Sequence, residues 1–269
     1  MSLYKLLTAH PIAPALRQRI EHELDRIEQE HQVQILYACE SGSRAWGFAS
    51  PDSDYDVRFV YLRRPERYLT ARPERDVIEC PIDAVLDISG WDLRKALDLG
   101  GESNPTLLEW LRSPVVYRQH ARRAAQLREL TERFFARDRA YHHYLSMARK
   151  NDREHLKGET VRLKKYFYVL RPLMAARWLR LRDDAPPMVF AELAEVVLHE
   201  PELIEAINEL LALKMRAGEA ERGPARPVLR AFIDAELALA MQQAPTKGER
   251  QPLAALDEFL ADCVLSQLH

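Results

Sequence analysis

The sequence predicts an α+β protein in which a small mixed-sheet domain is followed by an all-α helical domain. Runs rich in β-branched and aromatic residues alternate with helical patterns up to about Arg118. From about Gln119 onward apolar residues recur at helical spacing and strand signals vanish. A chain of 269 residues is long enough for two domains of ordinary size. We therefore expect domains over residues 1–118 and 119–269.

The first domain is expected to begin with a helix over residues 13–30, because Leu16, Ile20, Leu24 and Ile27 form one apolar stripe. Strand patterns follow, the last of them bounded by Pro81 and Gly90. Pro105, preceded by the capping residue Asn104, suits the first position of a helix ending near Arg112. The expected strands are Val33–Cys39, Asp56–Tyr61, Ala84–Ile88 and an edge strand in Ser113–Tyr117, with a further helix over Trp91–Leu99 and a solvated loop over Arg63–Arg75.

The second domain is expected to contain helices only, separated by short polar or proline-bearing connections. The predicted helices are His120–Arg137, Tyr141–Lys157, Glu159–Arg182, Met188–Leu198, Pro201–Arg216, Pro227–Gln243 and Pro252–Leu268.

Composition excludes several classes of protein. Apolar residues make up 47% and charged residues 30%, which is typical of a globular chain rather than a disordered one. The formal net charge of -2 provides no global field toward nucleic acid or an anionic membrane. Three widely spaced cysteines form no disulfide framework, and no run is long enough for a signal peptide or a membrane span. We expect a cytoplasmic protein with no membrane partner, and its oligomeric state stays open.

The residues that point to chemistry lie between Gly42 and Asp56. Gly42 allows a tight turn, and Ser43 can offer its hydroxyl and backbone amide to phosphate oxygens. Asp54 and Asp56 are separated by one residue, so at a strand start their side chains project to the same face and can share divalent cations. Carboxylate oxygens suit Mg²⁺ or Mn²⁺.

A third carboxylate is expected from a later strand, because two-metal phosphoryl-type transfer is usually organised by several acidic side chains. Asp87, flanked by Leu86 and Ile88, is the first choice. Asp83 lies on the same face by period two and is the rival. The predicted catalytic and metal-binding residues are thus Asp54, Asp56 and Asp87.

The run GSRAWGFASPDSDYDVRFVYL resembles the DNA polymerase β-like nucleotidyltransferase superfamily, with Gly-Ser followed by Asp-x-Asp and a third acid on a neighbouring strand. The ordered blocks ACESGSRAWGFASPDSDYDVRFVY, ISGWDLRKAL, NPTLLEWLRSPVVY and LKKYFYVLRPLMAARW are similar to the RNA-repair-associated family of predicted nucleotidyltransferases called RlaP. The resemblance runs from about Leu36 to Trp178. It implies that the first domain is a nucleotidyltransferase catalytic domain carrying Gly42, Ser43, Asp54, Asp56 and Asp87, with two metals and an NTP.

Lys164, Tyr168 and Arg171 lie at spacings of four and three beside an apolar stripe on the helix expected at 160–180. A cationic and aromatic ridge of this kind can hold triphosphate and stack a base. The resemblance implies the same role, because the three residues match the family's KKYFYxLR block in a helical nucleotide- or substrate-binding domain. Arg44 could contact phosphate or pair with Glu40. Trp46 and Phe48 are favoured as packing anchors for their loop.

These features predict an NTP-dependent nucleotidyltransferase that uses Mg²⁺ or Mn²⁺ and transfers an NMP to an acceptor hydroxyl with release of pyrophosphate, ATP being the favoured donor. The acceptor stays open between an RNA end, a protein side chain and a small molecule such as an aminoglycoside. The alternatives are a toxin-type nucleotidyltransferase that modifies tRNA or protein, and a catalytically silent nucleotide-binding module.

Overall fold

The computed structural model describes residues 11–80, 83, 85–216, 221–240 and 242–268. Two compact units share the chain. The sheet unit comprises residues 11–42, 54–135 and 249–268, and the helical unit comprises 43–53 and the described part of 136–248. These units are groups of residues that pack mainly with one another, and they are not shown to fold independently. The domains expected at 1–118 and 119–269 therefore stay a prediction.

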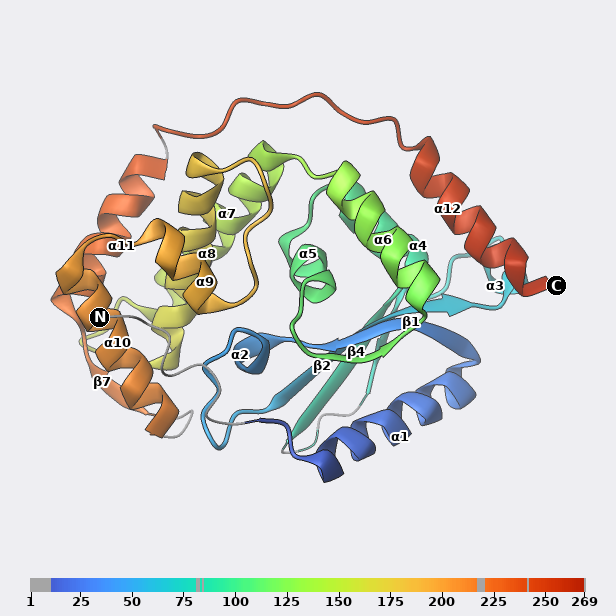
Figure 1. Ribbon diagram of the computed structural model, residues 1–269, viewed down its shortest axis with the longest axis horizontal. Coiled ribbons are helices and arrows are strands. Elements are labelled where there is room, and N and C mark those ends of the chain that lie inside the picture. The colour runs from blue at the N-terminus through green and yellow to red at the C-terminus, as the bar shows by residue number, and fades with distance from the viewer. Residues whose placement is uncertain (1–10, 81–82, 84, 217–220, 241, 269) are drawn as a thin grey trace. The chain divides into compact units, whose positions relative to one another are not determined.

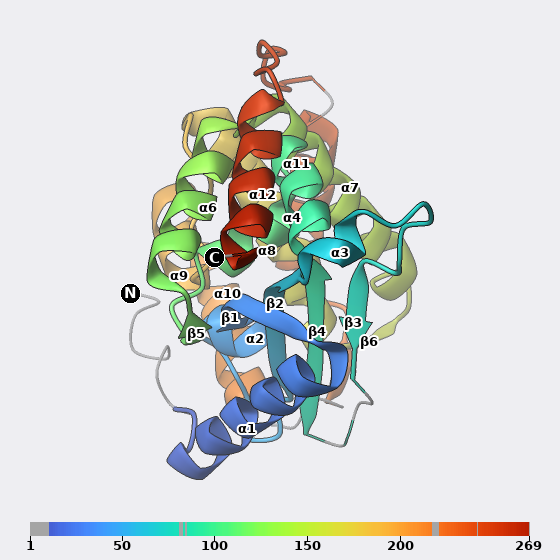
Figure 2. The ribbon, with the colours of Figure 1, turned by 90° about the vertical axis from the view of Figure 1, so that its right-hand side faces the viewer.

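The sheet unit is built on one five-stranded mixed sheet of order β3-β4-β2-β1-β5. β2 pairs antiparallel with β1 and parallel with β4, and β5 lies at one edge beside β1, as the sequence predicted for an edge strand. Figure 2 shows β2, β4 and β3 side by side. The strands are β1 (Val33–Glu40), β2 (Tyr55–Arg63), β3 (Val77–Glu79), β4 (Leu86–Asp92) and β5 (Val116–Gln119).

Helices cover both faces of this sheet (Figure 1). α1 (Pro14–His31) buries Ile20, Leu24 and Ile27 against one face, as its apolar stripe predicted. The other face contributes Val60 and Leu62 to a second core that it shares with the remaining helices. Those helices are α4 (Leu93–Gly101), α5 (Pro105–Leu111), α6 (Ala121–Arg133) and α12 (Ala254–Leu265). A short α3 (Pro65–Tyr68) lies within the segment expected to be a loop, and the 3-10 turn η2 (Ser266–Leu268) follows α12.

β4 extends further than the sequence predicted, because Gly90 lies inside the strand rather than after it. A Cβ at Gly90 would lie 2.2 Å from the Phe59 ring, so the glycine leaves the space that this buried ring fills. Trp91 therefore belongs to β4 instead of beginning a helix, and Asp92 caps α4 by accepting from the Arg94 amide at 2.8 Å. Ala84, predicted as the first residue of this strand, and Pro81, predicted to precede it, lie outside the described residues.

The helical unit contains most of the helices that the sequence predicted for this part of the chain. It also contains two short strands, although we expected helices only. Its helices are α7 (Arg137–His155), α8 (Lys164–Leu181), α9 (Phe190–Val197), α10 (Pro201–Arg216) and α11 (Pro227–Ala240). The expected helix from Glu159 is wrong at its start, because Thr160–Arg162 form strand β6, paired antiparallel with β7 (Arg222–Pro224). Val161, which is buried, anchors this ribbon. Within the described ranges, no helix has the length and apolar character needed to cross a membrane.

Candidate active site

Two of the predicted aspartates meet on neighbouring parallel strands of the sheet unit. Asp56 on β2 pairs in register with Asp87 on β4. Tyr55 and Val57 flank Asp56 in sequence, and Val57 is buried toward the α1 side, so the Asp56 side chain projects from the opposite face. The carboxylates of Asp56 and Asp87 are each about one third exposed, at 29% and 30%. Asp54 is exposed and lies one residue before β2 begins.

Arg58 joins the two carboxylates. It stands two residues after Asp56 on β2, and its Nη2 donates to Asp56 Oδ1 at 3.2 Å and to Asp87 Oδ2 at 2.7 Å. The guanidinium is only 17% exposed, so these charge-assisted hydrogen bonds are partly shielded from water. The Asp-x-Asp-x-Arg alternation could have revealed this residue, because a period of two places Arg58 on the Asp56 face.

Gly42 and Glu40 hold the backbone around Asp56. Gly42 has φ +60°, and a Cβ there would lie 2.0 Å from Asp56 Oδ2. The carboxylate of Glu40 is fully buried, and it accepts from the Asp56 amide at 2.9 Å and from the Tyr117 hydroxyl. The Ser41 amide donates to the Asp56 carbonyl at 2.8 Å. Sequence reasoning missed this role of Glu40, because only the pairing of β1, β2 and β5 brings the groups together.

Asp83, the alternative candidate for the third carboxylate, forms an ion pair with Arg19 and accepts hydrogen bonds from two main-chain amides. Its Oδ1 accepts from the amides of Val85 and Leu86, each at 2.8 Å, and its Oδ2 pairs with Arg19 of α1. The Val85 amide and then Arg19 hold the pKa of the Asp83 carboxyl below its usual value. The structure therefore places Asp87, rather than Asp83, beside Asp56.

Ser43 and Arg44 belong to a loop of the helical unit whose beginning is hydrogen-bonded to its end at Ser53. Gly42–Ala45 form the single turn α2, and the loop continues to Ser53. Ser43 Oγ donates to Ser53 Oγ at 3.2 Å, and Arg44 Nη2 donates to the Ser53 carbonyl at 2.6 Å. Phe48 anchors this loop as expected: it is 1% exposed and its ring lies 4.6 Å from that of Phe167 on α8. Lys214, another residue that the sequence did not single out, is buried and donates to the Phe48 carbonyl at 3.2 Å.

The three predicted phosphate- and base-binding residues of α8 lie in different environments. Arg171 is 2% exposed, donates to the Met188 carbonyl at 3.2 Å and stacks 5.0 Å from the Trp46 ring, so it is buried rather than part of an exposed ridge. Tyr168 meets Trp46 edge-on at 5.9 Å. Lys164 is half-buried at the first position of α8. Their roles toward a nucleotide stay predictions.

The donor chemistry of the aspartate pair fits a hard divalent cation. No cluster of three or more His, Cys, Asp or Glu side chains able to hold a metal exists among the residues that the structure describes. Mg²⁺, however, is usually held by one or two carboxylates together with substrate phosphates and water. Asp56 and Asp87 supply that pair, and they already converge on one cationic group. The ligand role predicted for Asp54 stays a prediction.

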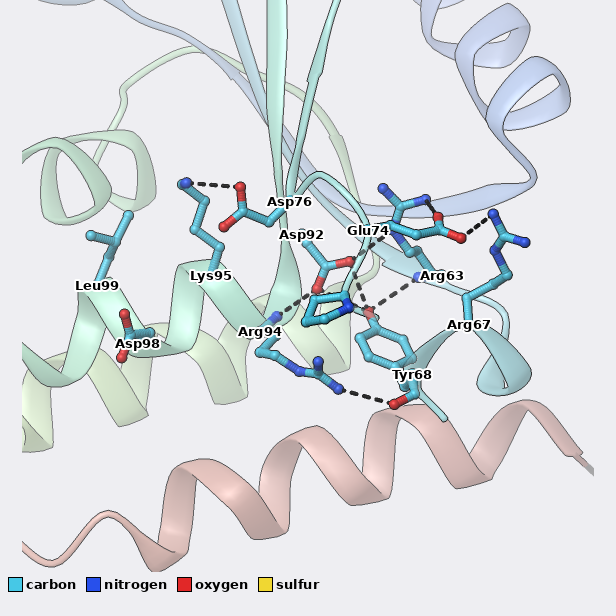
Figure 3. A pocket seen from close by; sticks show the side chains of 11 residues that line it. Arg63, Arg67, Tyr68, Glu74, Asp76, Asp92, Arg94, Lys95, Asp98 and Leu99 are labelled. Atoms are coloured by element: carbon cyan, nitrogen blue, oxygen red, sulfur yellow. Dashed lines mark hydrogen bonds and ion pairs between the residues drawn. The ribbon is translucent and has the colours of Figure 1, made fainter. Parts of the chain in front are cut away.

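A pocket of about 410 Å³ is lined by Arg63, the last residue of β2, and so lies at the other end of this strand. Figure 3 shows the side chains that line it. Its charged side chains pair with one another: Arg63 contacts Glu74 at 3.0 Å and Asp92 at 3.2 Å. Burial raises the pKa of Asp92. Arg63 lies seven residue steps after Asp56 along β2, which corresponds to roughly 23 Å. This pocket is therefore distinct from the aspartate pair.

Comparison with known proteins shows similarity over almost the whole chain. The family described as RlaP, RNA repair pathway DNA polymerase beta family, matches residues 16–262. "Uncharacterized protein YcgL" of Bacillus subtilis (strain 168) is 46% identical over 251 residues, which are 93% of this chain and 96% of that protein. The crystal structure of a nucleotidyltransferase-like protein from Exiguobacterium sibiricum 255-15 shares 13% identity with a TM-score of 0.33, covering 93% of this chain and 76% of that one.

Proposed function

Because the chain belongs to the RNA repair pathway DNA polymerase beta family, RlaP, and is thus a polymerase β-like nucleotidyltransferase, we propose that it transfers an NMP from an NTP to an acceptor hydroxyl. The bond between the α-phosphorus and the bridging oxygen breaks as the acceptor oxygen attacks, and pyrophosphate leaves. ATP is the donor we favour. The observation that carries the proposal is the in-register pairing of Asp56 with Asp87.

The two carboxylates would hold Mg²⁺ or Mn²⁺, with Asp54 as the proposed third ligand. A divalent cation bound there would screen the triphosphate, lower the pKa of the acceptor hydroxyl and neutralise charge on the leaving pyrophosphate. Asp87 would act as a metal ligand or as the general base that accepts the proton of the acceptor hydroxyl. The Glu40 carboxylate keeps the Asp56 main chain in place through the amide hydrogen bond of 2.9 Å.

The remaining predicted residues are proposed to bind the nucleotide. Gly42 and Ser43 would present the turn to phosphate oxygens, with Arg44 as a further phosphate contact. Lys164, Tyr168 and Arg171 are proposed for the triphosphate and the base, on the strength of the family's shared block in α8. Burial of Arg171 favours a role in which it supports Trp46 as well.

An RNA 3′ end is the acceptor we propose, because the family is described as part of an RNA repair pathway. The net charge of -2 supports a short footprint, in which a few phosphates and the terminal hydroxyl are recognised rather than a long duplex.

The test is incubation with each α-labelled NTP, Mg²⁺ or Mn²⁺, and separate pools of RNA, protein and small-molecule acceptors. We expect label on RNA, and Asp56→Asn and Asp87→Asn to lower the rate at least about a hundredfold, since each removes a carboxylate ligand. Asp83→Asn is the matched control. Asp83 pairs with Arg19, so we expect this substitution to leave the rate of transfer unchanged.

Other outcomes identify the rival functions. Label on protein or tRNA, with growth arrest on expression that the Asp56 variant abolishes, would favour a toxin-type enzyme. Measurable NTP binding without incorporation into any pool would favour a catalytically silent module.

A further inference from the structure

The guanidinium of Arg58 lies where the two carboxylates of the proposed metal site converge. Its Nη2 contacts Asp56 Oδ1 at 3.2 Å and Asp87 Oδ2 at 2.7 Å. Its Nη1 donates instead to main-chain oxygens, the carbonyls of Val57 at 3.0 Å and Asp87 at 3.1 Å. One nitrogen thus binds the site's carboxylates, and the other is attached to the two strands.

We propose that Arg58 is a positioning residue that cross-links Asp56 and Asp87 in the nucleotide-free protein and competes with a divalent cation for their oxygens. The inference rests on the proposed function, because it assigns the same carboxylates to the metal.

Arg58 has separate contacts to main-chain carbonyls and to carboxylates, so it can lose the carboxylate contacts and still stay bound at the site. The bonds from Nη1 to the carbonyls of Val57 and Asp87 use no carboxylate oxygen, so a cation held by the carboxylates of Asp56 and Asp87 would not compete for them. The guanidinium then remains beside the metal as an added positive charge. Metal binding without nucleotide is disfavoured on two counts, competition for ligands and repulsion between cations.

The same charge has the opposite effect once a triphosphate is present. The phosphates would bring several negative charges and further oxygen ligands, which would offset the repulsion between Arg58 and the cation. Arg58 therefore couples the metal to the nucleotide, so that the cation binds weakly alone and much more tightly with an NTP.

The test measures Mn²⁺ binding to the full chain by electron paramagnetic resonance, without nucleotide. We expect Arg58→Gln to bind Mn²⁺ about tenfold more tightly than the unmodified protein, because it removes one unit charge and the competing donor. Arg58→Lys should gain only about threefold, since one ammonium keeps the charge but does not span both carboxylates and both carbonyls. With a non-hydrolysable NTP present, we expect the difference between the variants to shrink.

Matched controls distinguish competition between Arg58 and Mn²⁺ from a general effect of removing an arginine. Arg19→Gln removes an arginine that pairs with Asp83 in the same unit and should leave Mn²⁺ affinity unchanged. Asp56→Asn added to Arg58→Gln should abolish the gain. Unchanged or weaker Mn²⁺ binding in both Arg58 variants, with melting temperatures like that of the unmodified protein, overturns the proposal.

The two proposals fail separately. If the unmodified protein transfers label but neither Arg58 variant binds Mn²⁺ more tightly, the competition is wrong and the transferase function stands. If Arg58→Gln gains affinity but no label is ever transferred, the competition stands and the transferase function is wrong.

Discussion

Gly42 shows how closely a single residue is tied to the carboxylate pair. Its φ of +60° lies in the left-handed region, and its α-carbon faces Asp56 Oδ2 so closely that a Cβ would lie 2.0 Å from that oxygen. Any side chain at this position must therefore displace either the turn or the carboxylate.

We predict that Gly42→Ala lowers nucleotidyl transfer by at least about tenfold and destabilises the fold by about 1–2 kcal/mol, the usual cost of a left-handed non-glycine residue. Transfer rate and urea denaturation measure the two effects. Gly248→Ala is the control, because the added Cβ would meet Asp138 at an ordinary 3.8 Å. Full activity in Gly42→Ala would show that Asp56 need not occupy its observed position.

At this same scale, the sequence identified residues by local spacing and missed those whose partners are distant. The Asp54-x-Asp56 spacing marked the right strand, but Glu40 contacts Tyr117 across 77 residues of chain. No local pattern predicts that contact, because it depends on the pairing of β1 with β5.

Among the elements, β2 and β4 determine the geometry of the site because they are the parallel pair that carries Asp56 and Asp87. Phe59 and Gly90 are partners in the same register. The Phe59 ring fills the space above Gly90, so this contact holds the two strands in the alignment that the aspartates require.

We predict that Gly90→Ala destabilises the protein by about 1–3 kcal/mol through overpacking against the Phe59 ring. Phe59→Leu should cost less in the Gly90→Ala background than alone, since it removes the ring that the new methyl group meets. Urea denaturation of the four proteins gives this coupling as a double-mutant cycle. Additive effects would mean that the two residues do not constrain each other.

The helix α8 illustrates what periodicity predicts at the level of an element. The apolar stripe Leu163, Phe167, Leu170, Met174 and Trp178 is buried as predicted. The start of the helix was wrong because β6 pairs with β7, which lies about 60 residues later, and a three-residue strand has too few positions to show a period.

For the whole molecule, the balance of charge sets an expectation for the acceptor. The chain has 39 basic and 41 acidic residues, and many of the described arginines are paired with acids, as Arg118 is with Glu21, Asp25 and Glu28. An arginine paired in this way contributes less positive potential toward a nucleic-acid backbone than an unpaired one would.

We predict that affinity for an RNA 3′ end falls by only about tenfold between roughly 50 and 200 mM salt, as for about two neutralised phosphates. Fluorescence anisotropy of a labelled oligonucleotide measures this slope, and a non-specific basic protein provides the comparison. A loss approaching about 10³-fold would reveal an extended phosphate-binding surface instead.

The sequence by itself determined the α+β class, most helices and the Asp-x-Asp strand, because hydrophobic period, capping residues and turn chemistry act between residues close in the chain. Only the tertiary structure decided that Asp87 rather than Asp83 lies beside Asp56, that Arg58 bridges them, and that Gly42 faces Asp56 Oδ2. Arg58 and Asp87 are 29 residues apart, and their meeting follows from strand register. Strand register is set by packing on both faces of the sheet, and this packing cannot be predicted from residues that are close in the sequence.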